Sequence, residues 1–223
     1  MGVSLLIITN GRQEYIQQTI ASLESVVNYV FDRQIIVDDS MDSGYHEWLR
    51  NHYGDYEVHP NASKAGLSGS IAHGWSLLGS DSDFVFHLEE DFTFNHHVDI
   101  DLMRKILESN AQISQVALVR QPLNSSEIAS GGVLKQYVGQ FVDHTIDSPS
   151  GQHRWLEHQI LFTLNPCLYP KWVMDMGWMS GWGEREFTDH LLSADKRFAY
   201  LGDIDVSPQV HHIGHHRATG WQL

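Results

Sequence analysis

The sequence predicts an α/β protein with a mostly parallel central sheet flanked by helices. Residues 3–9 and 34–37 are two strand-like apolar runs, and the segment between them repeats its apolar residues every three or four positions, as an amphipathic helix does. A strand, a helix and a strand at this spacing form a right-handed unit whose two strands are parallel. In such sheets, ligands bind beyond the carboxyl ends of the strands.

The first strand, residues 3–9, is apolar throughout and ends in the turn 9–11, so we expect it to be buried on both faces. The helix that follows presents its apolar face through Ile16, Ile20, Leu23, Val27 and Val30. The second strand, residues 34–37, runs directly into Asp38 and Asp39. Polar groups therefore follow both strands at the edge where a ligand is expected.

The alternation of strands and helices continues beyond the second strand. The elements expected next are a strand at 57–59, a helix at 66–78, a strand at 84–88, a helix at 99–108 and a strand at 116–119. Between residues 131 and 182 the pattern weakens into short strands and turns, and a further helix is expected at 184–192.

The composition favours one acidic, soluble domain. The chain has 223 residues, of which 42% are hydrophobic, so it can bury a sizeable core. Its 28 acidic and 14 basic residues give a formal net charge of -14, which disfavours non-specific binding to nucleic acid or anionic lipid. The single cysteine, Cys167, excludes an intramolecular disulfide framework, and no apolar stretch reaches the roughly 20 residues of a membrane span. We therefore expect a cytoplasmic protein.

Acidic residues gather at three predicted loops, 38–39, 89–91 and 184–186. Carboxylates collected at one edge of a sheet repel one another unless a cation neutralises them. Glu89 and Asp91 are separated by one residue, a spacing that can present oxygen ligands to magnesium or manganese. The alternative interpretation of such pairs is a solvated turn or a helix cap.

Two further segments carry candidate functional groups. The tail, residues 211–216, holds four histidines, and imidazole suits manganese, zinc or iron better than magnesium; surface histidines or an expression tag are the alternatives. Near residue 182, the indole of Trp182 offers a flat platform for a sugar ring, beside a carboxylate, Glu184, that can take a hydroxyl proton. The alternative is that Trp182 is a core residue and Glu184 a first-turn helix residue.

In their order and spacing, these segments resemble the glycosyltransferases of the GT-A fold, especially glycosyltransferase family 2 and its relatives that transfer galactose or N-acetylgalactosamine. The likeness covers residues 3–217 and is weakest between about 122 and 170. It implies a single domain over residues 1–223, in which about residues 1–120 bind the nucleotide sugar and about 121–223 bind the acceptor.

The resemblance also implies which residues meet the donor. The turn 8–12 stands where the family contacts the nucleotide, the segment 37–40 is similar to the one that holds the base and ribose, and Lys64 lies in a segment that can reach the diphosphate. The donor-binding residues so implied are Thr9, Asn10, Arg12, Asp38, Asp39, Lys64 and Glu90.

The segment 86–91 resembles the metal-binding Asp-x-Asp turn, with Glu89 at the first acidic place and Asp91 at the second. Glutamate at the first place is a departure from the family pattern, so Asp91 is the better ligand. In the tail, Ile213-Gly214-His215 with Arg217 is similar to an element whose histidine completes the metal site; His211 and His212 are alternatives. The implied metal ligands are Asp91, Glu89, His215 and His212.

The segment 181–186 looks like the acceptor motif Gly-Trp-Gly-Gly-Glu-Asp, in which Trp182 and Gly183 meet the acceptor. Its acidic residue is the base in inverting members of the family. Arg185 stands where one register expects an acid, so both Glu184 and Glu186 remain candidates for this base.

The implied activity is transfer of a sugar from a nucleotide-diphosphate donor, with a UDP-sugar favoured, to an acceptor hydroxyl, with inversion favoured. Mn²⁺ or Mg²⁺ would neutralise the departing diphosphate. The acceptor is a glycan, a protein or a small molecule, whereas the acidic charge disfavours nucleic acid. Three alternatives stay open: a sugar-phosphate nucleotidyltransferase, an inactive transferase-like domain for binding or scaffolding, and a histidine-rich metal-binding protein.

Overall fold

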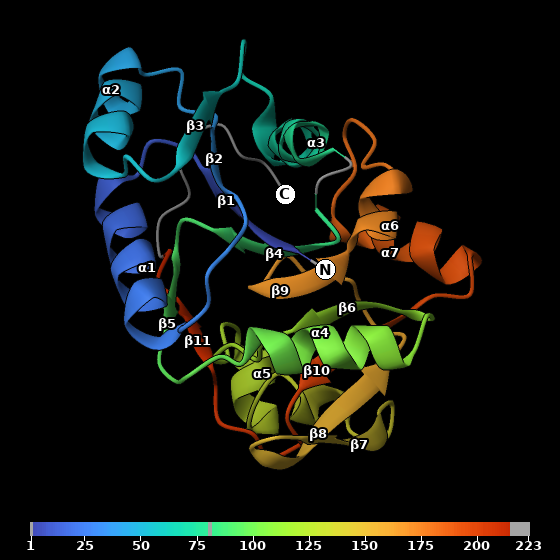
Figure 1. Cartoon of the computed structure of the whole chain (residues 1–223). Helices are drawn as coiled ribbons and strands as arrows, with labels where there is room; N and C mark the ends of the chain where they lie inside the picture. Colours follow the sequence, from blue (N-terminus) through green and yellow to red (C-terminus); the bar gives the residue numbers. More distant parts are fainter. Residues whose placement is uncertain (1, 80–81, 215–223) are drawn as a thin grey trace.

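The computed structural model describes residues 2–79 and 82–214, which form a nine-stranded sheet with helices on both faces (Figure 1). The strands of this sheet are β1 (Val3–Thr9), β2 (Gln34–Asp38), β3 (Glu57–Pro60), β4 (Phe84–Glu89), β6 (Ile113–Ala117), β7 (Val142–Ser148), β8 (Gly151–His158), β9 (Cys167–Pro170) and β10 (Arg197–Leu201). Two short strands, β5 (Phe92–Phe94) and β11 (Val210–His212), form a separate antiparallel pair. The helices are α1 (Gln13–Val26), α2 (Ser43–His52), α3 (Gly66–Leu78), α4 (Ile100–Ser109), α5 (Ser125–Ser130), the 3₁₀ turn η1 (Lys135–Tyr137), α6 (Lys171–Asp175) and α7 (Glu184–Ser193).

The strand order in the large sheet is β3-β2-β1-β4-β9-β6-β10-β8-β7. Neighbours from β3 to β4 are parallel, as are β6 and β10, whereas β8 and β9 run against the other strands. The predicted α/β class with a mostly parallel central sheet is therefore confirmed. The antiparallel β9, which lies between β4 and β6, is a feature that the sequence did not predict.

Two hydrophobic cores lie on the two faces of the sheet. Strand β1 is fully buried because its side chains alternate between them: Val3, Leu5 and Ile7 pack in one core, and Leu6 and Ile8 in the other. The first core is closed by helices α1, α2 and α4, and the second by α3, α6 and α7 (Figure 1). A strand buried on both faces reads as a continuous apolar run, which is why the sequence identified β1.

The small sheet joins two segments that lie far apart in sequence. Strand β11, from the histidine-containing tail, pairs antiparallel with β5, and this register sets His212 opposite Phe92. Strand β5 begins directly after the acidic turn that ends β4. The pairing therefore carries the tail to the acidic turn.

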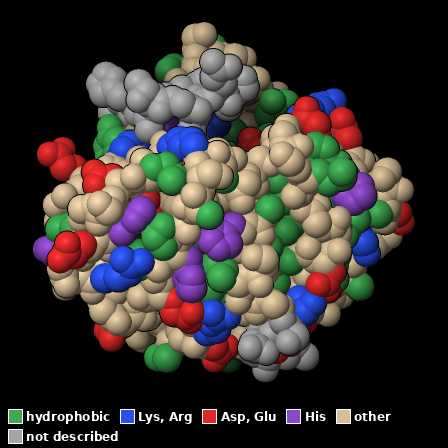
Figure 2. Space-filling view, turned by 90° about the horizontal axis from the view of Figure 1, so that it is seen from above, with side chains coloured by type: hydrophobic (Ala, Val, Ile, Leu, Met, Phe, Trp, Pro, Cys, Tyr) green, Lys and Arg blue, Asp and Glu red, His purple; other side chains and the backbone are tan. Residues whose placement is uncertain are grey.

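Within the described part of the chain, no helix is long and apolar enough to cross a membrane. On the face seen in Figure 2, acidic and basic side chains of the described residues lie interspersed.

Asp99, expected at a helix N-terminus, caps α4 by accepting a hydrogen bond from the backbone of Leu102 at 2.9 Å.

Two buried histidines make the stability of the fold depend on pH. Burial lowers the pKa of His87, and likewise of His158, to about 3, and no protein group bonds either ring nitrogen of His87 among the described residues. The unfolded chain takes up protons near pH 6.5 while the folded chain does not, so stability falls as pH drops from 6.5 toward 3.

We expect each histidine to lower the free energy of unfolding by about 2 kcal/mol between pH 7.5 and pH 5. In His87→Leu, urea denaturation at the two pH values should show a smaller pH effect than in the wild type. His96→Leu, at an exposed position, is the control and should keep the wild-type pH effect. An unchanged pH effect in His87→Leu would contradict the assignment.

Candidate active site

The carboxyl ends of β1, β2 and β4 meet at one edge of the sheet and carry the polar residues expected there. Thr9 of β1 is in register with Asp38 of β2, and Ile8 with Glu89 of β4. Because the three strands are parallel neighbours, the segments that follow them converge. The structure therefore brings together the turn after β1, the acidic pair Asp38–Asp39 at the end of β2 and the acidic turn after β4.

Glu90 ties the turn after β1 to the turn after β4. It is 1% exposed and accepts hydrogen bonds from the hydroxyl of Thr9, the backbone of Asn10 at 3.1 Å and the Nε of Arg12 at 2.5 Å. Burial raises the pKa of Glu90, although the charge of Arg12 opposes this. Glu90, expected to meet the donor, thus has its carboxylate occupied within the protein.

Asp91 lies beside the side chains of Arg12 and His212. Its Oδ2 is 2.8 Å from Nη2 of Arg12 and 3.4 Å from Nε2 of His212. Burial would raise the pKa of Asp91, but the hydrogen bond from His212 and the charge of Arg12 outweigh burial and lower it. Asp91 is therefore ionised, as a metal ligand must be.

The residues expected to hold the base and ribose are fully buried. Asp38 accepts a hydrogen bond from Nε2 of His46 at 2.7 Å, while its Oδ1 has no bonding partner among the described residues. Asp39 accepts from the backbone nitrogens of Ala65 at 2.7 Å and Gly66 at 2.9 Å, and so satisfies the N-terminus of α3. Both carboxylates fix local structure at the end of β2.

Lys64 bridges the same region. Its Nζ donates to Oδ1 of Asn10 at 2.5 Å and to the carbonyl of Asp39 at 2.6 Å. The side chain of Lys64 is 42% exposed, so it lies at the surface where the turns after β1 and β2 meet. The expected donor residues Asn10, Asp39 and Lys64 are thus direct neighbours.

A cavity of about 390 Å³ lies beside the acidic turn. Glu89, Glu184 and His212 all line it, although they come from β4, α7 and β11. Burial raises the pKa of Glu89 well above its ordinary value, and the nearby charges of Asp91 and Glu184 raise it further. The cavity thus collects one predicted metal ligand of the acidic turn, one predicted base and one tail histidine.

Glu184 and Glu186, the two candidate bases, have different surroundings. Glu184 lines the cavity, and its Oε1 accepts a hydrogen bond from the backbone of Leu164 at 2.5 Å. Burial raises the pKa of Glu184, against the effect of that hydrogen bond. Glu186 is exposed and bonds the backbone nitrogen of Gly183 at 2.9 Å, as the capping residue of α7.

Trp182 and Gly183, expected at the acceptor, lie outside the lining of the cavity. The indole of Trp182 packs against the rings of Phe187 and His190, with centroids 6.3 and 5.2 Å away. Gly183 is the N-cap of α7. The geometry thus gives both residues a role in starting α7, which is the helix that presents Glu184.

Asp91 carries an oxygen that could accept a cation. Within residues 2–79 and 82–214, no three side chains of His, Cys, Asp or Glu lie close enough together to hold a metal ion. Asp91, however, has a buried Oδ1 with no bonding partner among these residues, and a cation prefers such an oxygen. A Cβ at Gly214 would overlap Oδ2 of Asp91, so glycine lets the tail pass against this carboxylate. His215, the next residue, lies outside the described residues.

Sequence reasoning missed much of the cavity wall. Arg120 forms a bidentate ion pair with Glu127, at 2.8 and 3.0 Å, and both line the cavity with Tyr137 and Tyr200. These residues lie on β10 or between β6 and β7, where the hydrophobic pattern is weak. The nearest sequence signal is Asn124, followed three residues later by Glu127, a spacing typical of a helix start.

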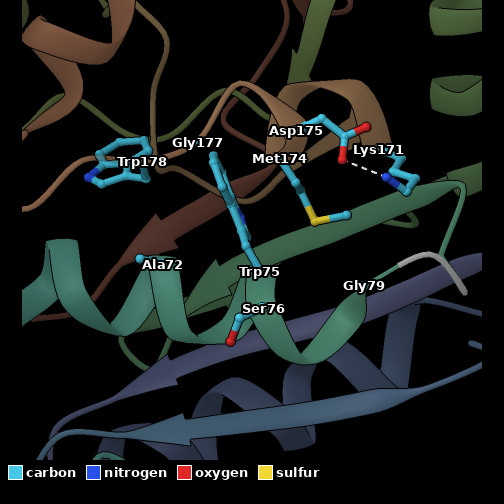
Figure 3. A pocket seen from close by; sticks show the side chains of 9 residues that line it. All are labelled: Ala72, Trp75, Ser76, Gly79, Lys171, Met174, Asp175, Gly177 and Trp178. Carbon is cyan, nitrogen blue, oxygen red and sulfur yellow. Dashed lines mark hydrogen bonds and ion pairs between the residues drawn. The ribbon is translucent and has the colours of Figure 1, made fainter.

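A second cavity, of about 420 Å³, lies between α3 and α6 (Figure 3). Trp75 and Met174 extend into the space between the two helices, and Nζ of Lys171 pairs with Asp175 at 2.5 Å beside them. None of the residues predicted for the site lines this cavity. The candidate active site is therefore the cavity beside the acidic turn.

A family model matches most of the chain. The family model described as "Glycosyl transferase family 2" matches residues 4–179, which include the acidic turn and most of the large sheet. A search of curated protein sequences finds no match to the chain.

Two solved structures have a similar fold. The structure of GalNAc-T7 with UDP, GalNAc and Mn²⁺ gives a TM-score of 0.67 at 12% identity, covering 100% of this chain and 45% of that one. The structure of S. aureus TarS, residues 1–349, in complex with UDP gives a TM-score of 0.59 at 14% identity, covering 95% of this chain and 60% of that one. This chain thus spans about half the length of these proteins, and at such identities the likeness shows a shared fold.

The buried cluster around Glu90 generates a stability prediction. In Arg12→Ala, Glu90 and Asp91 lose their cation while remaining buried, so we expect the free energy of unfolding to fall by about 3 kcal/mol. In the control Arg185→Ala, which removes an exposed pair with Asp189, the change should stay within about 0.5 kcal/mol. Urea denaturation at pH 7 measures both; similar losses in the two variants would contradict a structural role for Arg12.

Proposed function

The chain belongs to glycosyl transferase family 2, and on this basis we propose that it transfers a sugar from a UDP-sugar to an acceptor hydroxyl in a metal-dependent, inverting reaction. The observation that carries the proposal is the cavity in which Glu184 and Glu89 meet beside Asp91 and His212. An inverting transfer needs a carboxylate to receive the acceptor proton, close to the site that neutralises the diphosphate. Both kinds of group border this space.

Glu184 is the proposed base. It attracts the proton of the acceptor hydroxyl while that oxygen attacks the anomeric carbon from the face opposite the diphosphate. Its hydrogen bond from Leu164 occupies Oε1 and fixes the orientation of the carboxylate. Glu186 is the weaker candidate because its carboxylate already caps α7.

The proposed metal is Mn²⁺, which would be held by Asp91 and His212, with His215 from the tail. It would supply positive charge to the leaving diphosphate. The Oδ1 of Asp91, which has no bonding partner among the described residues, can bind a cation, and the mixed oxygen and nitrogen donors favour manganese over magnesium. Glu89 has a raised pKa and is therefore the poorer ligand of the acidic turn.

The donor and acceptor sides follow the halves of the chain. We assign UDP to the surface where Asn10 and Lys64 meet, close to Arg12 and the ends of β1 and β2. In this assignment, Asp38, Asp39 and Glu90 support that surface from below. Residues from about 121 onward supply the acceptor side. The proposal as a whole is tested by measuring whether UDP raises the melting temperature of the chain and whether the chain transfers a sugar from a UDP-sugar.

Substitution of the two glutamates separates catalysis from capping. We expect Glu184→Gln to lower kcat by about 10²–10⁴-fold because the base is lost, while UDP still binds. Glu186→Gln should keep kcat within a fewfold and lower the free energy of unfolding by about 1 kcal/mol or less. Steady-state kinetics and UDP titration distinguish the two. Full turnover in Glu184→Gln would remove the assignment.

The raised pKa of Glu184 predicts the pH profile. A base is active when deprotonated, so kcat/KM should fall as the pH drops through the pKa of Glu184. Since burial raises this pKa, we expect the acidic limb above pH of about 4.3, the value of an unperturbed glutamate. Rates with a saturating metal concentration at each pH measure it, and a limb at or below pH of about 4.3 would argue against Glu184.

Removal of metal ligands tests the metal site without relying on activity. UDP with Mn²⁺ at a hundred times its Kd should stabilise the wild type by about 2.7 kcal/mol, and EDTA should abolish most of this effect. Asp91→Asn and His215→Ala should weaken Mn²⁺ binding, whereas His211→Ala, at an exposed position of β11, is the control. Thermal shift and Mn²⁺ titration by electron paramagnetic resonance measure this; wild-type Mn²⁺ binding in Asp91→Asn would exclude the proposed site.

A further inference from the structure

The cavity is lined by residues of two kinds. Glu89, Glu184, His212 and the Arg120–Glu127 ion pair are polar or charged. Six further lining residues are apolar or aromatic, and we call them the apolar wall: Leu123, Val133, Tyr137, Phe141, Ile160 and Leu161. A reactive polar end beside an apolar wall is the arrangement that binds an amphiphilic small molecule.

The apolar character continues from the cavity to the protein surface. Leu123 lines the cavity and is also 46% exposed. Ile128, Val138 and Val142 are each more than half exposed, and each directly follows a residue that lines the cavity. We call the segment 121–142 the apolar rim. It holds more of the exposed large hydrophobic side chains than the rest of the described chain, and such clustering marks interaction sites.

The apolar rim is also electrically neutral. Its two charged residues are Glu127 and Lys135. Glu127 pairs with Arg120 at 2.8 Å, and Nζ of Lys135 pairs with Asp205 at 3.0 Å. On a protein with a net charge of -14, this neutral segment neither attracts nor repels a charged ligand strongly. An uncharged partner is the one that gains most from it.

We propose that the acceptor is a small uncharged amphiphile, whose hydroxyl faces Glu184 and whose aryl or alkyl group lies on the apolar wall and rim. This inference rests on the proposed function, because it names the acceptor class of the same site. A cavity of about 390 Å³ is within the range of small-molecule sites. It accommodates a ring or short chain next to a hydroxyl-bearing group.

Glucosides that differ only in the group at the anomeric oxygen test this proposal. The probes are methyl, phenyl, n-hexyl and 4-carboxyphenyl β-D-glucoside, titrated by calorimetry into the full chain with UDP and Mn²⁺. We expect phenyl or n-hexyl glucoside to bind at least tenfold more tightly than methyl glucoside. The carboxylate should remove most of the gain of the phenyl group, because it would have to be desolvated against an apolar wall.

Substitution at the exposed rim locates the effect without disturbing the core. Leu123→Ser should reduce the preference for phenyl over methyl at least threefold, and Val138→Ser is a second rim variant. Val30→Ser is the matched control, because Val30 is 92% exposed and lies outside the rim; it should keep the wild-type preference. All variants should bind UDP as the wild type does.

The outcomes separate this inference from the proposed function. UDP binding with no preference among the glucosides, or with no detectable glucoside binding, overturns the amphiphilic acceptor and leaves the transferase assignment standing. A preference that survives both rim variants also overturns it. Absence of UDP binding with a retained, rim-dependent preference would instead overturn the donor assignment and support the apolar site.

Discussion

The burial of the Glu90 carboxylate is the constraint on which the site depends. A buried carboxylate is costly unless donors surround it, and here the donors are Thr9 at the end of β1 and Asn10 and Arg12 in the turn that follows. The hydroxyl of Thr19 in α1 also bonds the Glu90 carbonyl. The first turn is thereby locked to the acidic turn after β4. Glu89 and Asp91, on either side of Glu90, then have a fixed position from which they face the cavity and the tail.

The charged residues around Glu90 are only partly paired with one another. Arg12 spans Glu90 and Asp91, and His212 approaches Asp91 from β11. Among the described residues, no cationic side chain pairs with Glu89 or Glu184 in this way. Burial raises the pKa of both carboxyls, and the charges of Asp91 and Glu184 raise that of Glu89 further. A cation that neutralised this group would lower those pKa values and favour the ionised carboxylates. The site therefore has the electrostatics of a place that gains by binding positive charge.

The sequence predicted the parts of the fold that local patterns encode. Strands β1, β2 and β4 are buried on both faces or end at acidic residues, and helices α1 and α4 each carry an apolar face. The hydrophobic pattern of these elements can therefore be recognised in the sequence. Strand β9 has four residues and no alternation, and its place between β4 and β6 depends on long-range pairing. The pairing of β11 with β5 likewise cannot be recognised in the sequence, yet it brings His212 to Asp91. The local surroundings of Glu184 and Glu186 likewise required coordinates, since both lie in the first turn of one helix.

The different surroundings of Glu184 and Glu186 show that the first turn of α7 serves two purposes. The first turn of α7 has free backbone donors, which favour acidic residues whatever their function. Glu186 satisfies this need by bonding the nitrogen of Gly183, and the contact leaves Glu184 free of a capping duty. Glu184 is instead fixed by Leu164, from the loop that precedes β9. Strand β9 lies between β4 and β6 in the sheet, and the sequence did not predict it. The loop that precedes β9 supplies Glu184 with its hydrogen-bond partner and the cavity with part of its wall.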